Sequence, residues 1–319
     1  MPSAEGRKIG IVGAGLIGRA WAVVFARAGA AVAVFDADPE AMHQAPGAIG
    51  AGLRALAETG LLEEAPAKAL QRIALAKSLP EAVADADYVQ ESVAETLPAK
   101  RAIFAELDQC AAPQTILASS TSNIPGSLFS ETLPGRARVL VAHPVNPPHL
   151  VPLVELVPTR HSDPDIVAKA KALLEDAGQV PIVVKREIEG FILNRLQAAL
   201  LNEAFRLVED GYVSTADLDK TIKHGLGLRW SFMGPFETID LNAPGGVRDY
   251  VRRYAAAIRR LAEQQADPRA WPDDLVDRIE AERRLVLPAA KLAERAAWRD
   301  RRLAALLAHK RREDETSGI

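Results

Sequence analysis

The sequence has little of what marks secreted, membrane-spanning or disulfide-stabilised proteins. Its single cysteine, Cys110, has no partner for an internal disulfide, which favours a reducing compartment. No apolar run reaches the roughly 20 residues that span a bilayer, because Arg, Asp, Glu or Lys interrupts every candidate. Residues 1–7 are polar and lead straight into a strand-like segment, so we expect no signal peptide. These absences predict a cytoplasmic protein.

An excess of charge of one sign is also missing. The 319 residues include 39 Lys and Arg and 42 Asp and Glu, which gives a formal net charge of −3. We therefore expect neither nucleic acid nor membrane as a partner, and we predict no metal site. Acids alternate with the arginines of the C-terminal region, which is typical of a solvated helix surface. With 48% hydrophobic and 25% charged residues, the composition is that of a globular protein of two domains or one large one.

Strand-like and helix-like segments alternate in the first 185 residues, and helical segments alone follow. Apolar runs rich in Val and Ile at 8–12 and 31–36 flank a helical segment at 16–28. A strand, a helix and a second strand within about 30 residues imply a parallel sheet. Further strands are predicted at 73–76, 88–91, 116–119, 139–142, 153–157 and 180–184. The fold class is therefore α/β: a Rossmann-type doubly wound, mostly parallel sheet at 1–187, followed by an all-helical C-terminal domain at 188–319.

A glycine-rich turn joins the first predicted strand to the first predicted helix. The motif consists of Gly13, Ala14, Gly15, Leu16, Ile17 and Gly18. Gly13 permits the tight turn, Gly15 lets a pyrophosphate approach the backbone, and Gly18 lets the helix pack closely on the strand. The phosphates then meet the helix N-terminus, where free N–H groups and the helix dipole favour negative charge. The motif predicts a dinucleotide site.

Asp36 indicates which dinucleotide binds. It ends the second predicted strand, where a carboxylate can accept hydrogen bonds from both ribose hydroxyls. The same charge would repel a 2′-phosphate, and the next arginine is as far away as Arg54. These features favour NAD over NADP. FAD, which shares the motif, and a purely structural turn remain as alternatives.

Four further segments place polar side chains at strand ends or between apolar neighbours. They contain Ser122 in SSTSN, His143 and Asn146 in HPVNPP, Glu155 in LVPLVELVP and Asn194 in GFILNRL. Glu155 is the single charge of its segment, and a buried carboxylate without a partner is costly, so we predict that it pairs with His143. A carboxylate behind a histidine fixes the tautomer and raises the basicity, as a general base for an alcohol requires. Structural hydrogen bonds, a Ser/Thr turn and an arginine partner for Glu155 are the alternatives.

With these motifs together, the chain resembles the 3-hydroxyacyl-CoA dehydrogenase superfamily over residues 7–309. The resemblance implies an NAD-dependent enzyme that oxidises a CH–OH group. It implies that the active site consists of Ser122, His143, Glu155 and Asn194. It also implies that Glu95 and Lys100, in ESVAETLPAK, lie near the nicotinamide half of NAD and that Asn146 belongs to the cofactor site. Finally, it implies that the helical domain contributes to the substrate site and forms a homodimer.

Within this superfamily the sequence is most similar to the L-gulonate 3-dehydrogenases, also known as lambda-crystallins. The similarity lies in the segments VAHPVNPP, PLVELVP and GLGLRWSFMGPFETIDLN. It implies oxidation of L-gulonate to 3-dehydro-L-gulonate. Arg229, between two glycine-flanked turns, can grip the carboxylate of a free hydroxy acid, a group that a CoA thioester lacks. Residues 39–72 contain few cations for the phosphates of CoA: Arg54, Lys68 and Arg72.

Three other functions remain open at this point. The first is an L-3-hydroxyacyl-CoA dehydrogenase. The second is an enzyme similar to L-carnitine dehydrogenase, whose trimethylammonium substrate would favour an aromatic cage. The third is a non-catalytic protein that has kept NAD binding. Arg229 could also have only a structural role, as a helix cap or in a surface ion pair.

Overall fold

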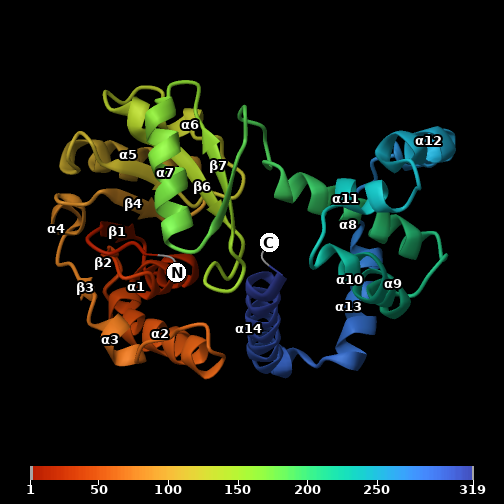
Figure 1. The fold of residues 1–319 in the computed structure, drawn as a ribbon, viewed down its shortest axis with the longest axis horizontal. Coiled ribbons are helices and arrows are strands. Elements are labelled where there is room, and N and C mark those ends of the chain that lie inside the picture. The colour runs from red at the N-terminus through yellow and green to blue at the C-terminus, as the bar shows by residue number, and fades with distance from the viewer. Residues whose placement is uncertain (1–2, 318–319) are drawn as a thin grey trace. The chain divides into compact units, whose positions relative to one another are not determined.

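The computed structural model describes residues 3–317, which form two compact units (Figure 1). The first unit contains the residues up to Asn194 together with those from Trp298 on, and the second contains Arg195–Ala297. The boundary predicted from the sequence, between 187 and 188, falls in the segment that links the last strand to the first helix of the helical region.

The first unit is built on one sheet of eight strands, and all eight strands predicted from the sequence are present. In spatial order they are β3 (Ile73–Leu75), β2 (Ala31–Phe35), β1 (Lys8–Val12), β4 (Tyr88–Glu91), β5 (Ile116–Ser119), β6 (Val139–Pro144), β7 (Leu153–Pro158) and β8 (Val180–Val183). Neighbouring strands are parallel, except that β6 and β7 are antiparallel. The predicted doubly wound, mostly parallel sheet is therefore confirmed. Chain order reverses between β1 and β4, which makes their carboxyl ends the switch point where ligands bind in such folds.

Helices cover both faces of the sheet. One face packs against α1 (Leu16–Arg27), α2 (Pro39–Glu58), α3 (Pro66–Leu70), α7 (Pro164–Asp176) and part of the last helix, α14 (Leu292–Ser317). The other face packs against α4 (Leu79–Val83), α5 (Leu97–Cys110) and α6 (Ser127–Ser130). A short 3-10 helix, η1 (Arg136–Arg138), precedes β6. Sequence analysis did not predict α4, α6 or η1, because one or two turns carry too little periodicity to be recognised.

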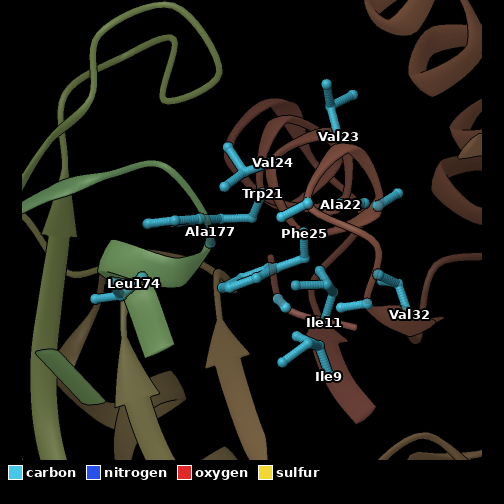
Figure 2. Packing of buried hydrophobic residues seen from close by; sticks show 14 of the residues in the cluster. Ile9, Ile11, Trp21, Ala22, Val23, Val24, Phe25, Val32, Leu174 and Ala177 are labelled. Carbon is cyan, nitrogen blue, oxygen red and sulfur yellow. The ribbon is translucent and has the colours of Figure 1, made fainter. Parts of the chain in front are cut away.

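The core beneath the glycine turn is centred on α1. Trp21 and Phe25 are fully buried and stacked, with ring centroids 5.5 Å apart, and Phe25 also contacts Tyr88 of β4. Figure 2 shows Ile9 and Ile11 of β1 in the same cluster. Full burial of such side chains contributes on the order of 2 kcal/mol each, which holds the N-terminus of α1 at the edge of the sheet.

The second unit is helical, as predicted. Its elements are α8 (Leu193–Glu209), α9 (Thr215–Thr221), the π-helical turn η2 (Ile222–Leu226), α10 (Gly227–Trp230), α11 (Pro235–Leu241), α12 (Gly246–Gln265), α13 (Asp273–Val286), η3 (Ala289–Lys291) and the first turns of α14. Ser214 caps α9 by accepting a hydrogen bond from Asp217 N–H, as its residue type predicts. Among residues 3–317 there is no helix long and apolar enough to cross a membrane.

Candidate active site

His143 and Glu155 form a buried pair on two adjacent strands. The sequence predicted that the strand would end at residue 142, but β6 continues through Pro144 and places His143 directly opposite Glu155 of β7. Side chains at opposed positions of an antiparallel pair lie on the same face of the sheet, close enough to touch. His143 Nδ1 is 2.8 Å from Glu155 Oε2, and both residues are buried. The pairing predicted from the sequence is thus present in the structure.

Backbone groups hold the other oxygen of Glu155. Oε1 accepts hydrogen bonds from Ile192 N–H at 2.7 Å and Leu193 N–H at 3.0 Å, at the start of α8. Burial raises the pKa of Glu155, but the hydrogen bonds from His143, Leu193 and Ile192 outweigh it and hold the pKa below its ordinary value. The carboxylate is therefore ionised at neutral pH. Because it can then only accept, Nδ1 of His143 carries a proton, and in the neutral ring Nε2 is the acceptor.

Phe191 is a site residue that the sequence did not reveal. It is fully buried and lies against the His143 ring, with centroids 5.7 Å apart. Its φ of +48° lies in the left-handed region, which is uncommon for any residue other than glycine and costs roughly 1 kcal/mol or more. This turn aims the N–H groups of Ile192 and Leu193 at Glu155. A strained backbone conformation has no signature in residue type, so only the structure could reveal it.

Hydrogen bonds join Asn194, at the start of α8, to Ser122 and Glu95. Asn194 Nδ2 donates to the carbonyl oxygen of Ser122 at 2.8 Å. Glu95 Oε1 in turn accepts from Ser122 N–H at 2.8 Å, from Thr121 Oγ1 at 2.7 Å and, more weakly, from Ser122 Oγ at 3.3 Å. Burial raises the pKa of Glu95, but these hydrogen bonds and the charge of Lys100 lower it to below its ordinary value. An ionised Glu95 therefore fixes the loop that carries Ser122.

Lys100 is buried rather than open to a ligand. Its Nζ donates to Glu91 Oε1 at 2.7 Å and to Val93 O at 3.2 Å, and it lies 3.6 Å from Glu95 Oε2. Glu91 is fully buried and also accepts hydrogen bonds from Ser119 Oγ and Val93 N–H. Burial raises the pKa of Glu91 and the Lys100 charge lowers it, with burial dominant. Sequence analysis missed Glu91, although a lone acid in a buried strand is the signal that singled out Glu155.

The glycine turn has the shape that a dinucleotide requires. A Cβ at Gly13, whose φ is +101°, would lie 2.6 Å from the backbone of Ser92, and a Cβ at Gly18 would lie 1.8 Å from Gly13 O. A Cβ at Gly15 would meet open space, and α1 begins there with no side-chain cap. Gly13 and Gly18 are thus required by packing within the chain, whereas Gly15 leaves free the space that a pyrophosphate would occupy.

The remaining candidates for cofactor and substrate binding, Asp36, Asn146 and Arg229, differ in their hydrogen bonds within the chain. Asp36 Oδ2 accepts from Ala14 N–H at 2.6 Å, so this carboxylate also fixes the glycine turn. Asn146 is exposed in the loop after β6. Arg229 lies on α10 in the second unit and is exposed; among residues 3–317 its side chain has no hydrogen-bond or ion-pair partner. The hydrogen bonds and ion pairs thus form two groups in the first unit: one joins His143 to Glu155 and the N–H groups at the start of α8, and the other joins Asn194, Ser122, Glu95 and Lys100. Among the described residues, the Asn146 side chain belongs to neither group.

Comparison with known proteins gives matches along most of the chain. The family model for the 3-hydroxyacyl-CoA dehydrogenase NAD-binding domain matches residues 8–188, and the model for the C-terminal domain matches 190–286. A lambda-crystallin homolog of Bos taurus is 42% identical over 300 residues, which is 92% of either chain. An L-carnitine dehydrogenase of Streptomyces coelicolor is 36% identical over 300 residues, again 92% of either chain.

Solved structures agree with these matches. A 5-formyl-3-hydroxy-2-methylpyridine 4-carboxylic acid 5-dehydrogenase, an NAD+-dependent dismutase, superposes with a TM-score of 0.81 at 26% identity, covering 96% of this chain and 97% of its own. The (S)-3-hydroxybutyryl-CoA dehydrogenase of Ralstonia eutropha superposes with a TM-score of 0.65 at 27% identity, covering 82% of this chain and 90% of its own.

Proposed function

Because the chain belongs to the 3-hydroxyacyl-CoA dehydrogenase family, we propose that it oxidises L-gulonate, a small free hydroxy acid, to 3-dehydro-L-gulonate. The chain is an NAD-dependent oxidoreductase that acts on a CH–OH group, as are its relatives in this family. Its lambda-crystallin and L-carnitine dehydrogenase relatives make it a 3-hydroxy acid dehydrogenase. The observation that carries the proposed chemistry is the buried pair of His143 and Glu155.

In the proposed mechanism His143 is the general base. Glu155 holds the proton on Nδ1, so Nε2 accepts the proton of the 3-hydroxyl. As the imidazolium forms, the ionised Glu155 stabilises its positive charge without moving, because two backbone N–H groups already fix it. NAD, when bound, supplies the hydride acceptor.

Ser122 and Asn194 would hold the substrate oxygen. Asn194 uses one of its two N–H groups on Ser122 O and has the other available. Among the described residues, the Ser122 hydroxyl makes one long hydrogen bond, to Glu95 at 3.3 Å, so turning it to a substrate oxygen costs little free energy. Each good donor to an oxygen that becomes negative in the reaction lowers the activation free energy by about 2–4 kcal/mol.

For the NAD site we propose the glycine turn together with Asp36, Glu95, Lys100 and Asn146. The diphosphate would lie over Gly15 at the N-terminus of α1. The Asp36 carboxylate would accept hydrogen bonds from the ribose hydroxyls of the adenosine half. The two lone pairs on each oxygen of Asp36 allow this alongside its hydrogen bond to Ala14 N–H. Lys100 acts through Glu95, since its own Nζ is buried.

The choice of a free acid over a CoA ester rests on charge. Arg229 is exposed and unpaired among the described residues, so it is available for a carboxylate. Residues 39–72 offer few cations for CoA, and Arg72 is already engaged in an ion pair with Glu64. The relative named L-carnitine dehydrogenase also favours a free acid. The higher identity to a lambda-crystallin homolog, together with the resemblance of the sequence to the L-gulonate 3-dehydrogenases, favours L-gulonate.

We further propose that the protein works in the cytoplasm and as a homodimer formed through its helical unit. The single cysteine supports a reducing compartment. Large apolar side chains exposed along α12 support an interface, because a monomer rarely leaves such a stripe in water.

Replacement of the base tests the proposed chemistry. His143→Gln should lower kcat for L-gulonate roughly 10²- to 10⁴-fold while NADH binding is retained. His309→Gln, on the exposed face of α14, is the matched control and should keep kcat unchanged. Initial rates of NAD reduction at 340 nm and fluorescence titration with NADH give the two readouts. Near-normal kcat in His143→Gln would remove His143 from the mechanism.

A further inference from the structure

A chain of hydrogen bonds runs below the glycine turn, and its donors fix its direction. Tyr88 OH lies 2.5 Å from Gln90 Oε1. Gln90 Nε2 donates to Ala142 O at 3.3 Å, and a carbonyl oxygen can only accept, so the amide nitrogen must face that way. The oxygen of Gln90 therefore accepts from Tyr88, and its nitrogen is free to donate a second time.

Ser120 receives that second hydrogen bond. Gln90 Nε2 donates to Ser120 Oγ at 2.7 Å, and Trp21 Nε1 donates to the same oxygen at 3.2 Å. An amide nitrogen and an indole N–H are donors only, so the two lone pairs of Ser120 are used. The Ser120 hydroxyl must then donate, and its partner is Ser92 Oγ at 2.9 Å.

The Ser92 hydroxyl remains available as a hydrogen-bond donor. Its Oγ accepts from Ser120, and within residues 3–317 it has no other hydrogen-bond partner. The side chain is half-buried rather than fully enclosed. A serine hydroxyl that accepts a hydrogen bond from a protein neighbour can still donate its own O–H to a bound ligand.

The position of Ser92 in the sheet indicates which ligand its hydroxyl can reach. Ser92 directly follows β4, and its backbone lies against Gly13, the first glycine after β1. The carboxyl ends of β1 and β4 form the switch point of the sheet, where a dinucleotide binds. The oxygens of its phosphates and ribose hydroxyls are acceptors that suit an O–H donor.

We infer that Ser92 is a cofactor-binding residue whose hydroxyl donates a hydrogen bond to an oxygen of the bound NAD. The inference rests on the proposed function, because it requires a dinucleotide in this crevice. Tyr88, Gln90, Trp21 and Ser120 act behind it by fixing the direction of the Ser92 hydroxyl. None of these five residues belongs to the glycine motif.

Ser92→Ala tests the inference by NADH titration. Loss of one hydrogen bond should raise the Kd for NADH about three- to tenfold. The unfolding temperature of the free protein should fall only slightly, because the Ser120 hydroxyl loses its acceptor at a half-buried position. The rise in unfolding temperature that NADH gives to the wild type should shrink in the variant. Ser127→Ala is the matched control: Ser127 is also half-buried, and its hydroxyl has no partner among the described residues. Ser92→Gly, which also removes the hydroxyl, replaces Ser92→Ala if that variant does not fold.

The outcomes separate this inference from the proposed function. If the wild type binds NADH and Ser92→Ala binds it with a Kd within about twofold, Ser92 makes no hydrogen bond to NAD and the inference is overturned. If the wild type itself fails to bind NADH, the proposed function is wrong and the inference falls with it. A weakened variant beside an unchanged Ser127→Ala supports the inference.

Discussion

Two histidines of this chain show how the surroundings of a residue decide its chemistry. His143 lies against an ionised carboxylate, which keeps its ring in one tautomer. His149 has a buried Nδ1 without a hydrogen-bond partner among the described residues, while its carbonyl oxygen accepts from Arg27. Burial, followed by the charge of Arg27, lowers the pKa of His149 to about 4. Glu155 therefore holds His143 in the tautomer that the proposed general base requires, whereas burial keeps His149 neutral.

The neutral state of His149 makes stability depend on pH. In the unfolded chain its pKa returns to about 6.5, so between pH 6.5 and 4 the unfolded state binds a proton that the folded state does not. Stability should thus fall as the pH drops through this window. Between pH 7 and pH 5, the unfolding free energy of the wild type should fall by about 2 kcal/mol more than that of His149→Leu.

Urea unfolding at the two pH values measures this difference. His43→Leu, at an exposed position of α2, is the control and should behave as the wild type does. The same pH dependence in His149→Leu as in the wild type would show that His149 is not the group that titrates.

At the scale of elements, the turn between β1 and α1 separates two kinds of glycine. A Cβ at Gly18 would collide with the backbone, so Gly18→Ala should lower the unfolding free energy by about 1–3 kcal/mol. A Cβ at Gly15 would meet open space, so Gly15→Ala should cost much less stability. It should nevertheless raise the Kd for NADH at least about tenfold, because the methyl group occupies space proposed for the diphosphate.

Thermal unfolding and NADH titration of the two variants give these readouts side by side. A Gly15→Ala protein that binds NADH as the wild type does would place the diphosphate elsewhere.

The elements were largely predictable, and the failures have physical reasons. The inner strands β1, β4, β5, β6 and β7 are almost entirely buried and appear in the sequence as largely apolar runs. The edge strands β3 and β8 are mostly exposed, but their short apolar runs were also recognised. The end of β6 was misplaced because Pro144 suggested a loop, whereas pairing with β7 extends the strand. The sequence also predicts a last helix at 287–309. In the structure this helix begins only at Leu292 and continues through Ser317, because its polar end has helical composition without an apolar face.

The candidate site was predictable only in part. A polar residue at a strand end or among apolar neighbours can be recognised from the sequence, and this pattern identified His143, Glu155 and Asn194. The left-handed turn at Phe191 did not stand out, because backbone conformation is a tertiary property. Glu91 carried the signal of a lone acid in a predicted strand and was overlooked. The burial of Lys100 likewise depends on Glu91, which sequence analysis did not consider.

At the scale of the whole molecule, α12 provides a test of the proposed dimer. Its apolar stripe consists of Val247, Val251, Tyr254, Ile258 and Leu261, which are between 39% and 54% exposed. They recur at alternating intervals of four and three residues and so lie on one face of the helix. In a homodimer through the helical unit, this face would be buried against the second copy.

Sedimentation equilibrium should give the mass of two chains for the wild type. Val251→Glu combined with Ile258→Glu should reduce it to one chain, because burying two carboxylates in an apolar interface is costly. Arg252→Glu combined with Arg259→Glu adds the same two acids to the helix outside the stripe and is the control. A double variant on the stripe that keeps the mass of two chains would exclude this face as the interface.

The central claim is that a free 3-hydroxy acid, and not its CoA ester, is the substrate. The most direct measurement is NAD reduction at 340 nm with L-gulonate, L-carnitine, 3-hydroxybutyrate and 3-hydroxybutyryl-CoA, side by side at one pH. We predict turnover of free acids, highest kcat/KM with L-gulonate, and no turnover of the CoA ester. Turnover of the CoA ester alone would leave the His143–Glu155 chemistry in place but would contradict the role of Arg229 and the choice of L-gulonate.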